Sequence, residues 1–158
     1  MNKSKNAKSI MTNIGNLLSQ DSTNDQEKNW LLTQTDNPEL KDALAGLSTQ
    51  DLKVLNKIGN QERVLIKSLP AAVDLSQPTI SRMMNRLEKK NILEKYRTVK
   101  NNKEILVSLT PLGEKIADLH TQLDNHILQN VDNILSDYSD EEIEHFIEIL
   151  SKIQKIKL

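Results

Sequence analysis

The chain has 158 residues, 37% of them hydrophobic and 27% charged, which is the composition of a folded domain and excludes a disordered chain. It contains no cysteine, so disulfides, thiolate metal sites and thiol-based redox switches are excluded. No apolar run approaches the ~20 residues of a membrane-spanning helix and no apolar signal segment follows the polar N-terminus, so we expect a single cytoplasmic domain.

Short helices are predicted in the first part of the chain. The polar residues 1–9 are expected to form a mobile tail, and a helix should follow until the polar stretch 21–28 ends or bends it. The apolar edge of this helix consists of Ile10, Ile14, Leu17 and Leu18. An Asn-Pro break then precedes a short helical piece, residues 39–45, which Gly46 can cap.

A supporting helix is predicted to begin after Ser48, whose hydroxyl can cap it. Asp51, three positions further on, completes a weaker version of a capping box, and Gly59 with Asn60 ends the helix. Its inner stripe consists of Leu52, Leu55 and Ile58. This helix is expected to support the following two helices from behind.

Two short helices joined by a tight turn are predicted over residues 66–90. Asp74 lies where the chain must turn, because Asp tolerates the left-handed conformation better than most residues. Ser76 is a good N-cap for the second helix, and Pro78 falls in its first turn, where a missing N–H costs nothing. The apolar positions are Ile66, Leu69, Ala72, Val73 and Leu75 in the first helix and Ile80, Met83, Met84 and Leu87 in the second.

The face opposite the apolar stripe of the second helix carries polar side chains, none of them acidic. They are Gln77, Thr79, Ser81, Arg82, Asn85, Arg86 and Lys89. Side chains of these types at the exposed start of a helix pair with base edges and phosphates in a major groove. The pattern therefore favours a DNA-reading helix, with an ordinary solvated surface helix as the alternative.

Two β runs follow, residues 92–99 and 104–109, and predict a hairpin. The second run alternates apolar and polar residues, as a half-buried strand does. Between the runs, residues 100–103 contain adjacent asparagines, which suit a tight turn. A basic hairpin behind a helix-turn-helix is typical of a wing that lies against the phosphate backbone or the minor groove.

Positive charge is concentrated in the predicted reader helix and wing. Residues 76–103 hold eight basic and two acidic residues, a balance of +6, whereas the rest of the chain holds 13 basic and 20 acidic residues, a balance of −7. Attraction to phosphates depends on the local potential rather than on the net charge of −1, so the segment remains suited to DNA.

Two helices are predicted in the C-terminal part of the chain. Thr110 and Pro111 mark the start of a long helix, and Ser139 with Glu142 forms a capping box for the last one, after a break at residues 137–140. Their apolar positions are Ile116, Leu119, Leu123, Ile127, Val131 and Ile134, and then Ile143, Phe146, Ile147, Leu150, Ile153 and Ile156. We expect the last helix to form a dimer interface with the first helix; an intramolecular core helix is the alternative.

Much of this pattern is carried by three stretches, LSQPTISR at 75–82, LEKKNIL at 87–93 and LTPLG at 109–113. Together they resemble the MarR family of bacterial transcription regulators. The resemblance implies a mainly α fold with a small β-wing, in which residues 47–109 form the winged helix-turn-helix and residues 1–46 and 110–158 form dimerisation helices. It also implies a homodimer that binds pseudo-palindromic operators in double-stranded DNA and often answers to a small ligand.

The chain departs from the family pattern at several positions. Family members commonly carry an Asp-x-Arg pair in the wing, where this chain has Asn-Asn-Lys-Glu at residues 101–104. Pro70 stands where a small helical residue is usual, and Asp74 where Gly is frequent.

Patterns for catalysis and metal binding are weak. His120, His126 and His145 are the only histidines, and the first two are six residues apart, so they do not share a helix face. No Gly-rich phosphate loop or nucleophile elbow is present, so we expect neither enzymatic activity nor a cofactor. A metal-responsive regulator that uses the histidines stays open as an alternative. Trp30 is expected in the core or in a dimer contact rather than in a ligand site.

The resulting hypothesis is a sequence-specific DNA-binding regulator, a homodimeric repressor relieved by a small ligand. The predicted DNA-binding residues are Ser76, Gln77, Pro78, Thr79, Ser81, Arg82, Asn85, Arg86, Lys100 and Lys103. Arg82 and Asn85 should reach bases, and the two lysines should contact the backbone. Thr79 and Arg86 should divide between bases and phosphates. The rival hypothesis is a winged-helix protein-interaction module that has lost DNA binding, which the unusual wing and the acidic remainder of the chain favour.

Overall fold

The computed structural model describes residues 3–23, 26–59, 61–100 and 102–157. The chain separates into two compact units, residues 1–121 and residues 122–158, and the division falls inside one long helix. Each unit is described by itself. Within the described ranges, no helix combines the length and the apolar character that a membrane span requires.

Helices α1 (Lys3–Thr23), α2 (Gln26–Thr33) and α3 (Pro38–Ala45) form the first part of the chain. The mobile tail predicted over residues 1–9 is wrong for its described part, because α1 already begins at Lys3. Residues 3–9 contain no Pro or Gly, so nothing in them stops the downstream helix from extending backwards. The predicted break and restart are confirmed, since α3 follows an Asn cap whose side chain accepts hydrogen bonds from two backbone N–H groups.

Helix α4 (Thr49–Gly59) begins with the predicted capping box. The Ser48 hydroxyl accepts from the Asp51 backbone N–H at 3.1 Å, and the Asp51 carboxylate accepts from the Ser48 backbone N–H at 2.9 Å. The predicted inner stripe of this helix is fully buried. Gly59 is its last residue, as predicted, and Asn60 lies outside the described residues.

The helix-turn-helix is confirmed, with a divided first helix. A 3₁₀ turn, η1 (Ile66–Ser68), leads into α5 (Leu69–Val73), where Pro70 occupies the first turn and has no N–H to leave unpaired. Asp74 adopts the left-handed conformation, with φ 54° and ψ 49°, and α6 (Gln77–Lys89) follows. Ala72, predicted on the apolar half, is exposed because α5 is only five residues long and buries little beyond Leu69.

The wing belongs to a three-stranded antiparallel sheet in the order β1-β3-β2. Strand β2 (Leu93–Tyr96) pairs along its whole length with β3 (Leu106–Leu109), as predicted. Strand β1 (Val64–Leu65) pairs on the other side of β3. The sequence did not predict β1, because two residues cannot show a period of two.

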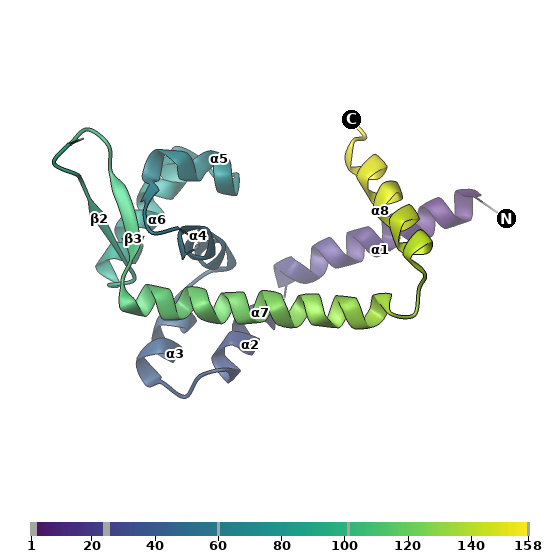
Figure 1. Ribbon diagram of the computed structural model, residues 1–158, viewed down its shortest axis with the longest axis horizontal. Coiled ribbons are helices and arrows are strands. Elements are labelled where there is room, and N and C mark those ends of the chain that lie inside the picture. Colours follow the sequence, from purple (N-terminus) through teal and green to yellow (C-terminus); the bar gives the residue numbers. More distant parts are fainter. Residues whose placement is uncertain (1–2, 24–25, 60, 101, 158) are drawn as a thin grey trace. The chain divides into compact units, whose positions relative to one another are not determined.

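The predicted tight turn of the hairpin is wrong. Strand pairing ends at Tyr96 and Leu106, so the connection spans residues 97–105 and projects beyond the paired strands (Figure 1). Within this loop the Arg97 guanidinium donates a hydrogen bond to the Asn102 carbonyl oxygen. This hydrogen bond across the loop stabilises a longer connection than the tight turn predicted from the two asparagines.

The wing joins α7 (Pro111–Leu135) through a tightly packed junction. The Thr110 hydroxyl lies 2.7 Å from the Asn91 carbonyl oxygen and 3.0 Å from the Ile92 carbonyl oxygen. It also accepts a hydrogen bond from the Gly113 N–H at 3.2 Å. Because Thr110 is buried, these bonds hold the first turn of α7 directly against the start of β2.

The core of the first unit lies between the helix-turn-helix, the sheet and the start of α7. The side chains of its helical part include those predicted for α4 and α6, namely Leu52, Leu55, Ile58, Ile80, Met83, Met84 and Leu87. Val107 of β3 and Ile116 of α7 are fully buried with them. In α2, Trp30 is half-buried next to the fully buried Leu31.

The second unit consists of the end of α7 and of α8 (Asp140–Gln154). The predicted capping box is present, since the Ser139 hydroxyl accepts from the Glu142 N–H and the Glu142 carboxylate accepts from the Ser139 N–H. Most of the predicted apolar positions of this unit are exposed. They include Ile127, Val131, Ile134, Phe146, Ile147 and Ile156.

Candidate nucleic-acid interface

The start of α6 is organised by a hydroxyl pair. The Ser76 Oγ accepts from the Thr79 N–H at 3.3 Å, and the two side-chain oxygens lie 2.7 Å apart. Thr79 is half-buried and is held by these contacts with Ser76, while Gln77 and Pro78 are exposed beside it. The free N–H groups of this first turn give the helix start a partial positive charge, which favours an anion there.

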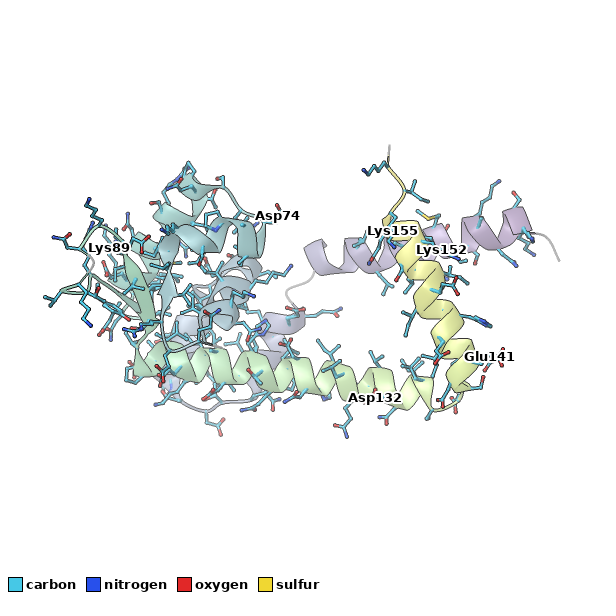
Figure 2. The ribbon with its side chains drawn as sticks, turned by 45° about the horizontal axis from the view of Figure 1, so that its top comes forward. Asp74, Lys89, Asp132, Glu141, Lys152 and Lys155 are labelled. Atoms are coloured by element: carbon cyan, nitrogen blue, oxygen red, sulfur yellow. The ribbon has the colours of Figure 1, made fainter. Side chains whose placement is uncertain are left out.

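The predicted polar side chains of α6 share its exposed face. Ser81, Arg82, Asn85 and Arg86 are all exposed, whereas the apolar stripe on the other side is buried. The Arg82 Nε donates to the Pro78 carbonyl oxygen at 3.3 Å, so this guanidinium lies along the first turn. Figure 2 labels two residues on either side of this face, namely Asp74 in the turn before α6 and Lys89, the last residue of α6.

Arg86 makes a bidentate ion pair with Asp51, the acidic member of the capping box of α4. Its Nη1 donates to Oδ2 at 2.9 Å and its Nη2 to Oδ1 at 2.5 Å. The Asp51 side chain is 1% exposed and that of Arg86 is 44% exposed, so the pair opens to solvent on the arginine side. The sequence did not predict this contact, since the two residues are 35 positions apart.

The pair changes the proton affinity of both groups. Burial by itself raises the pKa of Asp51, but the hydrogen bonds from Arg86 and Ser48 outweigh it and hold this pKa below its ordinary value. The hydrogen bond to Asp51 raises the pKa of Arg86 further. Both groups are therefore charged at neutral pH, and α4 and α6 are joined by a charge-assisted contact.

Strand β2 contacts the same helix through Lys95. Its Nζ donates to the Asn85 Oδ1 and lies 3.6 Å from the Glu88 carboxylate, while its backbone N–H donates to Glu88 at 2.9 Å. The amide oxygen of Asn85 is thus engaged within the protein, although the residue is exposed. In the sequence, Lys95 is recognisable only as one of the basic residues of the segment 76–103, because strand pairing determines where its side chain lies.

The two basic side chains predicted to contact DNA from the wing lie in its loop. Lys100 and Lys103 are both exposed. Glu104 forms an ion pair with Lys67 of η1. This contact ties the wing to the helix-turn-helix, which no local pattern in the sequence indicated.

The histidines do not form a metal site in the part of the chain that the structure describes. Within those ranges, no group of three or more His, Cys, Asp or Glu side chains is close enough to hold an ion. His120 is buried in α7, whereas His126 and His145 are exposed. The Asn130 side-chain nitrogen lies 3.3 Å from Nε2 of His126.

Comparison with known proteins agrees with this geometry. The MarR family model matches residues 47–105. The HTH-type transcriptional regulator YhjH of Bacillus subtilis (strain 168) is 27% identical over 97 residues, which cover 61% of this chain and 55% of YhjH. PchR, an HTH-type transcriptional regulator of the same organism, is 24% identical over 132 residues, 82% of this chain and 78% of PchR. The chain thus spans little more than half of YhjH.

Solved structures share the fold at low sequence identity. FabT of Streptococcus pneumoniae in complex with DNA superposes with a TM-score of 0.69 at 19% identity, covering 98% of this chain and 96% of FabT. A variant of ZitR of Lactococcus lactis in complex with DNA gives a TM-score of 0.74 at 16% identity, covering 94% and 95%. The adhesin competence repressor AdcR of Streptococcus pyogenes gives 0.66 at 18% identity, covering 96% and 95%.

The matched residues 47–105 contain α4, β1, the helix-turn-helix and β2, and they end before β3. The helix caps, the strand order and the buried stripe of α6 observed here are those of a winged helix. The winged helix-turn-helix of this chain is therefore similar to the MarR family over residues 47–105, and the curated proteins that the chain resembles are HTH-type transcriptional regulators.

Proposed function

We propose that this chain is a sequence-specific DNA-binding transcriptional regulator that acts as a homodimeric repressor. The observation that carries the proposal is the exposed face of α6, where hydrogen-bond donors and cations stand outside a fully buried apolar stripe. A helix of this kind fits the major groove, where base edges offer acceptors and donors in a distinct pattern for each base pair.

The side chains divide by what they can offer to DNA. Arg82, Gln77 and Ser81 face base edges, and Asn85 reaches them through its NH₂ group, since Lys95 engages its amide oxygen. Ser76, Pro78 and Thr79 form the helix start, whose N–H groups approach a phosphate. Lys100 and Lys103 contact the phosphate backbone beside the wing.

A second copy of the chain is the partner that the apolar surface of α8 implies. Ile143, Phe146, Ile147, Leu150 and Ile153 form a stripe over about a third of the circumference of this helix, and Phe146 and Ile147 are 56% and 58% exposed. An apolar surface of this kind marks a protein interface rather than a solvated helix. In a two-fold dimer the two α6 helices would enter successive major grooves, roughly 34 Å apart.

The remaining elements of the proposal follow from the mode of action. The protein binds rather than catalyses, and it acts on double-stranded DNA in the cytoplasm. Relief of repression by a small ligand is what the family resemblance implies.

Duplex binding at low salt tests the proposal directly. A labelled random duplex should bind the full chain at low ionic strength, and affinity should fall steeply as salt rises, since several phosphates are neutralised. Selection from a random duplex pool should then return two half-sites in inverted order, about 10 base pairs apart. Failure to bind any duplex at low salt would overturn DNA binding and favour a protein-interaction module.

A further inference from the structure

A buried carboxylate stands behind the reader helix. Asp51 is 1% exposed, and its two oxygens accept three hydrogen bonds, one from the Ser48 backbone N–H and two from the Arg86 guanidinium. The planar guanidinium matches the carboxylate with two parallel bonds. Arg86 therefore cannot turn towards a phosphate or a base without breaking both of them.

We propose that Arg86 is a positioning residue, which locks α6 onto the N-terminus of α4 through Asp51 and does not itself read DNA. The proposal rests on the proposed function, and it replaces the sequence-based assignment of Arg86 to bases and phosphates. Base reading then belongs to the part of α6 before Arg86, where Arg82 lies one turn away.

The burial of Asp51 explains why the pair stays closed. If Arg86 moved to DNA, the carboxylate would keep only its bond to the Ser48 N–H and would be a buried charge without a counter-charge. Leaving a buried charge in that state is strongly unfavourable. Contact with a phosphate in water-accessible surroundings offers less in exchange, because exposed ion pairs are weak and are screened by salt.

The lock matters because base recognition needs an accurately placed helix. Side chains that read a ligand must be held within about 0.5 Å of the productive geometry, usually by partners that do not touch the ligand. Here α6 is held by Asp51 of α4 through Arg86, and by Lys95 of β2 through Asn85 and Glu88. Removal of the contact between Arg86 and Asp51 lets α6 shift relative to α4, while the other charged side chains of α6 remain.

The salt dependence of DNA binding separates a positioning role from a phosphate contact. Each neutralised phosphate contributes about −0.9 to the slope of log affinity against log salt. We would measure fluorescence anisotropy of the full chain with a random duplex and with a duplex selected from a random pool. Lys100→Ala, which removes a proposed phosphate contact, should reduce the steepness of the slope by about 0.9 on both duplexes.

Arg86→Gln should behave differently from this control. The slope should stay that of the wild type, while affinity for the selected duplex falls about 10-fold more than affinity for the random duplex, a typical coupling within one ion-pair network. Asp51→Asn, which leaves Arg86 in place, should cause the same selective loss. The double variant should be no worse than the weaker-binding single variant, because both substitutions break one contact.

The opposite pattern would overturn the proposal. If Arg86 contacts a phosphate, Arg86→Gln reduces the slope by about 0.9 and Asp51→Asn leaves binding unchanged or tightens it by freeing a cation. Asp51→Asn keeps the side-chain volume, and circular dichroism at the temperature of the binding assay verifies that both variants are folded. If Arg86→Gln is unfolded there, Asp51→Asn decides alone, since selective loss supports the lock and unchanged binding refutes it.

The outcome remains distinct from a failure of the proposed function. Wild-type protein that binds no duplex at low salt removes DNA binding itself. Wild-type protein that binds, together with an unaffected Asp51→Asn, removes only the positioning role of Arg86.

Discussion

Gly113, in the first turn of α7, allows a close approach that no other residue can make. A Cβ atom built on it would lie 2.0 Å from the Ile92 carbonyl oxygen and 3.2 Å from the Cβ of Leu109. Real Cβ atoms essentially never lie within 3.0 Å of another heavy atom, so Gly113→Ala requires a shift of about 1 Å between α7 and β2. The obstacle is backbone, and it cannot rotate away as a side chain can.

The shift also disturbs the hydrogen bonds of the junction. The Ile92 carbonyl accepts from the Thr110 N–H at 3.1 Å, and the Gly113 N–H donates to the Thr110 hydroxyl. Overpacking of a tight core costs about 3 kcal/mol at the upper end of its usual range. The better helix propensity of Ala offsets about 1 kcal/mol of this. We therefore expect a net loss of about 2 kcal/mol and a melting temperature about 4–8 °C lower.

Gly15→Ala is the matched control, since it makes the same chemical change in another helix. Gly15 lies within α1, and a Cβ built there meets nothing within 4 Å. This substitution should raise the free energy of unfolding by up to about 1 kcal/mol. Urea unfolding followed by circular dichroism gives both values. If Gly113→Ala proves as stable as Gly15→Ala, the close packing of α7 on β2 described here is wrong.

Three further predictions concern the ion pair, the reader helix and the dimer. The pKa of Asp51 is lowered from 3.8, so the stabilisation by its ion pair is present above about pH 4 and is lost as pH falls through the pKa of the folded state. Between about pH 5 and pH 3, urea unfolding should therefore show a larger loss of stability for the wild type than for Asp51→Asn. Equal losses would argue against the pair. Arg82→Ala should weaken binding to the selected duplex by about 1–3 kcal/mol and blur sequence preference in anisotropy titrations, whereas an equal loss on random duplex would refute its base-reading role. Ile147→Asp should give a monomer in light scattering, while Lys152→Asp on the opposite, polar face of α8 leaves a dimer; a dimeric Ile147→Asp would contradict the proposed interface.

Local patterns predicted the helices and their ends well, because the signals that carry them lie within a few residues. The capping boxes of α4 and α8 pair residues three apart, and both are present as predicted. The left-handed Asp74 and the buried stripe of α6 follow equally from short-range sterics and from the 3.6-residue period. These features are sufficient to identify the helix-turn-helix and its polar face.

Contacts between distant segments could not be predicted from local patterns in the sequence. Strand β1 is defined only by its partner β3, and the long loop of the wing by where strand pairing stops. The predicted tail is wrong for a different reason. Helix α1 begins at Lys3, because nothing in the polar residues at this end of the chain opposes a helix. The exposed Ala72 shows that periodicity overstates burial in a very short helix.

The sequence by itself determined the capped starts of α3, α4, α6, α7 and α8, which face of α6 is buried, and that positive charge gathers in residues 76–103. Only the tertiary structure decided what the polar residues of that face do. It pairs Arg86 with Asp51 and Asn85 with Lys95, although both residues look equally available for DNA in the sequence. The physical reason is that caps and periodicity act over a few residues, whereas an ion pair forms wherever folding brings two charges together.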